Sequence, residues 1–119
     1  MTLQECYVKI GGDYNDILHR FMNENMVRKF VLKFPQDNNM ALFEESWAKK
    51  DYKTAFRAMH TLKGVAQNLG FGPLYKAAAE VTESLRPSET SSGDMEKAAK
   101  LMPAVDEEYA RTIAAIKEL

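Results

Sequence analysis

One stretch of the sequence places a histidine beside a lysine and a glycine at spacings that suit chemistry on a phosphoryl group. His60 is followed by Lys63 and Gly64 in a run rich in alanine, leucine and other good helix formers. At about 100° per residue, Gly64 lies about 40° and Lys63 about 60° from His60 around the helix axis. A neutral imidazole has an in-plane lone pair and can act as a nucleophile at pH 7. A lysine one turn away can neutralise charge on phosphate oxygens, so this arrangement favours phosphoryl transfer through His60.

The same helical wheel predicts that the His60 imidazole faces solvent. The apolar residues of this stretch gather around the opposite pole: Ala55, Ala58, Leu62, Val65 and Leu69. On the polar side, Gln67 and Lys53 lie within about 40° of His60, and Arg57 lies about 60° from it, across from Lys63. We therefore expect Arg57, Lys53 and Gln67 to support a phosphate or a partner beside His60.

Gly64 and Phe56 each have two interpretations. Glycine inside a helix costs roughly 1 kcal/mol relative to alanine, so Gly64 either packs closely against another helix or leaves room for a partner. Its closeness to His60 favours the second interpretation. Phe56, about 40° from His60, is the best candidate on this helix for an exposed apolar docking patch. The alternative is that Phe56 packs beneath the neighbouring helix.

Other chemistries of an exposed histidine lack necessary parts. No serine, cysteine or carboxylate stands at a spacing that would supply a nucleophile or orient the ring, as hydrolases require. Positive side chains around His60 oppose a metal ion, and His19 is isolated in the sequence. The glycines match neither a Walker motif nor a dinucleotide fingerprint. We therefore expect no metal, no cofactor and no ATP site.

The stretch from Ala58 to Gly70, AMHTLKGVAQNLG, is followed by Leu74 and by a helix expected to end at Arg86. With these features it resembles the histidine-containing phosphotransfer (HPt) domain of two-component phosphorelays, most sharply over residues 51–86. The resemblance implies a four-helix bundle whose exposed histidine accepts a phosphoryl group from an aspartyl phosphate on a receiver domain and passes it to another. It also implies a phosphocarrier rather than an enzyme. The expected partners are response-regulator receiver domains, including that of a hybrid sensor kinase.

The resemblance assigns roles to three residues and leaves one role open. His60 would be the phosphoacceptor, Lys63 the phosphate neighbour and Gly64 the small residue that gives the receiver room. Family members often carry Gln or Glu on the next helix, where this sequence has Thr82, a position whose side chain can contact the imidazole. Thr82 is shorter, and Gln67 is the other candidate for orienting the ring. The family also often has a small hydroxyl residue at the position of Val65.

The rest of the sequence predicts an all-α protein, an antiparallel four-helix bundle with a short N-terminal accessory helix. Valine and isoleucine are few, whereas alanine, leucine and methionine are abundant. Apolar spacing, caps and helix breakers give these expected helices: Leu3–Ile10, Tyr14 to Phe34 with a break left open near Asn23–Asn25, Met40 to about Lys50, Tyr52–Leu69, Pro73–Arg86, and Ser92–Glu118 with a kink at Pro103. Residues 88–93 are expected to form a polar loop.

Length and composition limit the classes of protein. The chain has 119 residues, 45% of them hydrophobic and 28% charged, which predicts one domain spanning residues 1–119. A net charge of -1 disfavours nucleic acid and anionic membranes as partners. The single cysteine, the lack of a leader-like N-terminus and the lack of a long apolar stretch favour a cytoplasmic protein that does not enter a membrane. A bundle of this size can bury its own core, so we expect a monomer.

Two other function classes stay open from the sequence. A helical adaptor or inhibitor could bind a receiver or a kinase without taking up phosphate. A nucleic-acid binder could use a basic cluster on two neighbouring helices, formed by Lys49, Lys50, Lys53 and Arg57. The balanced charge and the absence of an exposed aromatic series make the nucleic-acid function the weaker of the two.

Overall fold

The computed structural model describes residues 1–87 and 93–119 and shows only helices, turns and loops in them. In these described residues, seven α-helices and one short 3₁₀-helix follow one another. Their bounds are α1 Leu3–Ile10, α2 Tyr14–Phe21, α3 Glu24–Lys33, η1 Phe34–Gln36, α4 Asn39–Ala48, α5 Tyr52–Asn68, α6 Gly72–Leu85 and α7 Met95–Lys117. The protein is all-α, as the sequence predicted. None of the described helices is long and apolar enough to cross a membrane.

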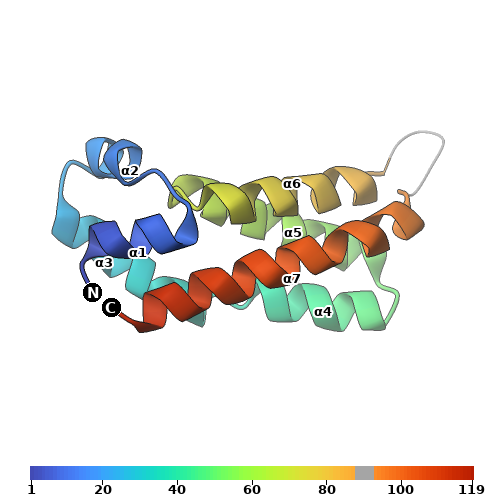
Figure 1. Ribbon diagram of the computed structural model, residues 1–119. Coiled ribbons are helices and arrows are strands. Elements are labelled where there is room, and N and C mark those ends of the chain that lie inside the picture. Colours follow the sequence, from blue (N-terminus) through green and yellow to red (C-terminus); the bar gives the residue numbers. More distant parts are fainter. Residues whose placement is uncertain (88–92) are drawn as a thin grey trace.

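Helices α4, α5, α6 and α7 form an up-and-down bundle. Short turns join α4 to α5 and α5 to α6, and α5 packs against both neighbours while α6 packs against α7 (Figure 1). Gly70, with φ of 75°, ends the α5 segment in the left-handed conformation that glycine adopts without strain. Proline at the first turn of α6 then starts the next helix. The four-helix bundle is therefore confirmed.

The three N-terminal helices close one end of this bundle. Helix α1 packs against α7, and the two chain termini lie close together at that end (Figure 1). Lys9 in α1 forms an ion pair with Glu118 after α7, with Nζ and Oε2 2.7 Å apart. Although α1 is short, it contributes fully buried side chains to the core: Leu3, Cys6, Tyr7 and Ile10.

The break left open near Asn23–Asn25 is present, so residues 14–34 form two helices rather than one. Met22 adopts a left-handed conformation, with φ of 57°, after the last turn of α2. The Asn23 side chain then accepts hydrogen bonds from the backbone N–H groups of Asn25 and Met26 and caps α3. The chain turns here because asparagine bonds to backbone N–H groups that a continuous helix would use internally.

The described part of α7 starts later than expected. Asp94 caps it by accepting from the backbone N–H of Lys97, and the helix begins at Met95. The predicted start at Ser92 and most of the expected 88–93 loop lie outside the described residues. Pro103 is within α7, which continues to Lys117. The other helix ends agree with the sequence-based expectation within two residues.

Candidate functional site

Helix α5 carries the candidate site and is fixed at its N-terminus by Asp51. One Asp51 carboxylate oxygen accepts from the Thr54 backbone N–H at 3.2 Å, and the other accepts from the Thr54 hydroxyl at 2.7 Å. These hydrogen bonds lower the pKa of the Asp51 carboxyl below its usual range. The cap therefore sets the start of the helix, and with it the direction in which each later side chain points.

The structure places the His60 side chain on the exposed side of α5, as the wheel predicted. The side chains that α5 buries lie on the opposite side of the helix: Ala55, Ala58, Met59, Leu62 and Ala66. His60, Arg57, Lys53, Gly64 and Gln67 are exposed, and Lys63 is half-buried. Val65, which the wheel placed toward the core, is only half-buried and packs at the core's edge.

The Phe56 ring lies beside the imidazole of His60, one helical turn earlier on α5. The Phe56 and His60 ring centroids are 6.0 Å apart and the two planes are inclined by 20°, which is a stacked arrangement. Phe56 is half-buried and packs against the core. The guanidinium carbon of Arg86, at the end of α6, lies 5.3 Å from the centre of the Phe56 ring. Of the two interpretations of Phe56, packing against the neighbouring helix is therefore the one that the structure favours.

The Glu83 carboxylate lies on the same side of the site as Arg86. Glu83 on α6 accepts two hydrogen bonds from Arg86, at 3.1 Å from Nε and 2.9 Å from Nη2. The hydrogen bond from Arg86 lowers the pKa of Glu83, and the nearby charges of Lys63 and His60 lower it further. The Glu83 carboxylate is therefore within electrostatic range of both His60 and Lys63.

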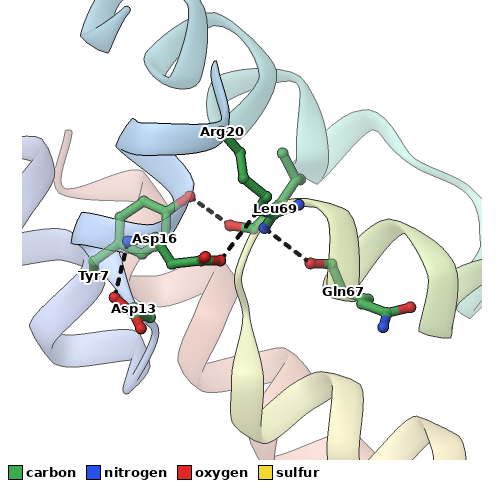
Figure 2. Close-up of polar contacts among 6 residues, drawn as sticks. All are labelled: Tyr7, Asp13, Asp16, Arg20, Gln67 and Leu69. Carbon is green, nitrogen blue, oxygen red and sulfur yellow. Dashed lines mark hydrogen bonds and ion pairs between the residues drawn. The ribbon is translucent and has the colours of Figure 1, made fainter. Parts of the chain in front are cut away.

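A surface hollow of about 590 Å³ opens on the other side of His60. It is lined by His60, Thr61, Gly64, Val65, Gln67, Asn68 and, from α2, Arg20. Arg20 Nε donates to Asp16 at 3.1 Å, and Nη2 donates to the Gln67 carbonyl at 3.4 Å (Figure 2). These contacts hold a guanidinium in the wall of the hollow.

Gly64 is not required by packing within the domain. A Cβ atom built on Gly64 would meet nothing within 4 Å. The interpretation that Gly64 packs closely against another helix is therefore wrong. The other interpretation, that Gly64 leaves room for a partner, is compatible with this open space.

The structure also shows which of the expected supporting residues reach the imidazole. The Thr82 side chain is fully buried, and its hydroxyl donates to the Ala78 carbonyl at 2.7 Å. Within residues 1–87 and 93–119, the His60 ring has no side-chain or backbone hydrogen-bond partner, so neither Thr82 nor Gln67 orients it by such a bond. Arg57 is one turn from His60, whereas Lys53 is two turns, or about 10 Å, away along the axis.

Sequence reasoning missed three charged residues near the site: Arg20, Glu83 and Arg86. The three-residue spacing of Glu83 and Arg86 predicts an ion pair on a helix. It does not say that this pair faces Phe56, because that depends on how α6 is rotated against α5. Arg20 reaches the site only because α2 folds back over the end of α5.

Comparison with known families agrees with this fold. The described residues form an all-helical bundle with His60 exposed on α5. The model of the Hpt domain family matches residues 25–115, so the chain belongs to the Hpt domain family. Hpt domains are phosphocarriers that interact with receiver domains, and the chain therefore has a phosphotransfer role in phosphorelays. Comparisons with curated proteins and with solved structures gave no match.

Proposed function

We propose that His60 is the phosphoacceptor of this domain. It accepts a phosphoryl group from the aspartyl phosphate of one receiver domain and passes it to the aspartate of another. A ring nitrogen of neutral His60 forms the new P–N bond while the P–O bond to the receiver's aspartate breaks. The aspartate leaves as a carboxylate, and the ring keeps its proton on the other nitrogen. In the second step the roles are reversed, and the imidazole is the leaving group.

The observation that carries this proposal is the exposed imidazole beside a glycine that has open space above it. In-line transfer brings a receiver's aspartate within bonding distance of the ring, and a side chain at position 64 would stand in its path. Lys63, one turn from His60, supports the proposal because its ammonium group can neutralise phosphate oxygens. Arg57, Gln67 and Arg20 line or flank the same surface and are proposed to assist binding of the phosphate or of the receiver.

The test is phosphoryl transfer from candidate receivers that carry a labelled aspartyl phosphate. We expect the wild-type domain to acquire an acid-labile, alkali-stable phosphate, as a phosphohistidine is. His60→Gln is expected to abolish the label. His19→Gln is the matched control, because His19 is the other histidine of the chain and is also exposed, and it is expected to label like the wild type.

Two results would contradict the proposal. Label that persists in His60→Gln would place the phosphate elsewhere in the chain. Receiver binding without transfer, even under excess phosphorylated donor, would favour the adaptor or inhibitor function instead.

A further inference from the structure

The reactive ring of a phosphocarrier must be oriented, and no hydrogen bond from the part of the chain that the structure describes orients His60. Thr82, one sequence-based candidate for orienting the ring, is buried, and its hydroxyl bonds to the backbone of its own helix. An exposed histidine without such a partner rotates among several rotamers. Transfer in line requires one of them, because misplacement of a reacting atom by about 1 Å can cost about a hundredfold in rate.

The contact that restricts the imidazole is the stack on Phe56. The two side chains are four residues apart on α5, so they lie one above the other on adjacent turns. Their interplanar angle of 20° makes the two rings nearly parallel, and the centroid distance of 6.0 Å lies within the range of offset-stacked aromatic pairs. The phenyl ring therefore limits the rotation of the imidazole on this side.

Phe56 is itself fixed by contacts from outside its helix. It packs against the core on one side, and the Arg86 guanidinium lies 5.3 Å from its ring centre. A guanidinium over an aromatic ring is attracted to the ring's negative face. Arg86 is in turn held by two hydrogen bonds to Glu83, so its planar group has a defined position. The chain of contacts therefore runs from α6 through Phe56 to the imidazole.

We propose that Phe56 is a positioning residue for phosphoryl transfer and that Arg86, held by Glu83, keeps Phe56 in place. The proposal rests on the proposed role of His60 as phosphoacceptor. It differs from a docking role, because Phe56 acts on the orientation of His60 rather than on the affinity for a receiver. The end of α6 thus controls the reactivity of a residue on α5 without touching the phosphate.

The two roles predict different kinetics for Phe56 variants. Single-turnover transfer from a phosphorylated receiver is measured as a function of receiver concentration for wild type, Phe56→Leu and Phe56→Tyr. In Phe56→Leu, which keeps an apolar side chain at the core's edge, we expect the maximal rate to fall about tenfold or more, with the half-saturating concentration within twofold of wild type. Phe56→Tyr keeps an aromatic ring at this position, so we expect its maximal rate to equal that of the wild type. An unchanged maximal rate, or a change in the half-saturating concentration alone, would overturn the proposal.

Arg86 offers a second variant with a matched control. Arg86→Ala is expected to lower the maximal rate severalfold, because it releases the ring on which His60 stacks. Arg111→Ala is the matched control. Like Arg86, Arg111 is an exposed arginine paired with a glutamate three residues earlier, but it lies on α7. We expect Arg111→Ala to transfer at the wild-type rate. Equal effects of the two variants would mean that Arg86 acts only through general stability, and would overturn its assigned role.

An NMR measurement separates this proposal from the proposed function. Three-bond couplings and ring relaxation of His60 report its rotamers without any receiver. We expect one dominant rotamer in wild type and averaging in Phe56→Leu and Arg86→Ala. If no receiver phosphorylates the wild type while these rotamer differences are seen, the phosphoacceptor role fails and the ring-fixing contact stands. If the wild type is phosphorylated while the variants show unchanged rotamers, the positioning role alone fails.

Discussion

At the scale of single residues, Gly64 has the clearest conflict between stability and function. The structure leaves open space where its side chain would be, and glycine inside a helix is less stable than alanine. Gly64→Ala is therefore expected to stabilise the isolated domain by about 0.5–1 kcal/mol, measured by urea unfolding. The added methyl group stands where the receiver's aspartate is proposed to approach His60, so phosphoryl transfer from a receiver is expected to slow at least tenfold.

Gly72→Ala is the matched control for this prediction. Gly72 is also helical and exposed, and a Cβ there would make only an ordinary contact, 3.8 Å from the Gly11 carbonyl oxygen. It lies at the start of α6, away from the hollow beside His60. We expect it to leave transfer unchanged. If Gly64→Ala also transfers at the wild-type rate, the role of Gly64 in giving the receiver room is wrong.

The residue scale also shows how far sequence can predict a site of this kind. The exposure of His60 follows from helical periodicity, because a single helix with one apolar side determines which residues face outward. The closeness of Phe56 to His60 follows from the same periodicity, because the two residues are four positions apart on one helix. The contact of Arg86 with Phe56 is not, because it depends on the rotation of α6 relative to α5. The burial of Thr82 likewise depends on tertiary packing, which turned its side chain inward, whereas its hydrogen bond to the Ala78 carbonyl is local to α6.

At the scale of elements, Tyr7 joins α1 to the end of α5. Its buried hydroxyl donates to the Leu69 carbonyl at 2.6 Å (Figure 2). Burial raises the pKa of Tyr7 far above its ordinary value of about 10, because the phenolate would lose its hydration. Tyrosine in the unfolded chain ionises near pH 10 while Tyr7 in the folded protein stays neutral. The stability from Tyr7 is therefore fully present below about pH 10 and is lost as the pH rises above it.

Tyr7→Phe is expected to have two effects that urea unfolding can separate. At pH 7 it lowers the free energy of unfolding by about 1–3 kcal/mol, because the buried Leu69 carbonyl loses its partner. Above about pH 10 the variant loses stability less steeply than wild type, by up to about 1.4 kcal/mol per pH unit. Parallel curves above pH 10 would show that Tyr7 ionises in the folded protein and would contradict the prediction.

Helix boundaries were predictable where a residue imposes the end, and ambiguous where two local structures compete. Gly11, with φ of 79°, and Asp13, which accepts from the Asp16 backbone N–H, produced the expected end of α1 and start of α2. The 14–34 stretch was ambiguous because its apolar spacing continues across the break. Asn23 resolves it as the cap of α3. The turn lets α2 lie against the end of α5, and this is what brings Arg20 to the site.

At the scale of the whole molecule, the turn after α1 packs against the turn after α5. This contact explains why α1 and α2 are fixed relative to the bundle. The turn after α1 and the turn after α5 meet at Gly12, where a Cβ would lie 2.4 Å from the Gly70 carbonyl oxygen. Glycine is the residue that permits this approach of two backbones. The contact fixes the N-terminal helices to the same end of α5 that carries Gln67 and Leu69. The site is thus assembled from the bundle and from the helices that close it.

Helix α1 lies outside residues 25–115, which the Hpt domain family model matches, yet its burial indicates that the fold depends on it. It buries four side chains completely or nearly so, and each such burial contributes about 1.5–3 kcal/mol. Their sum is comparable to the whole stability of a domain of this size, about 5–15 kcal/mol.

A variant lacking residues 1–12 is therefore expected to lose its cooperative thermal transition, followed by circular dichroism. Glu118→Gln, which removes only the exposed ion pair with Lys9, is expected to melt like the wild type. A truncated variant that melts within a few degrees of wild type would show that the bundle is stable without α1.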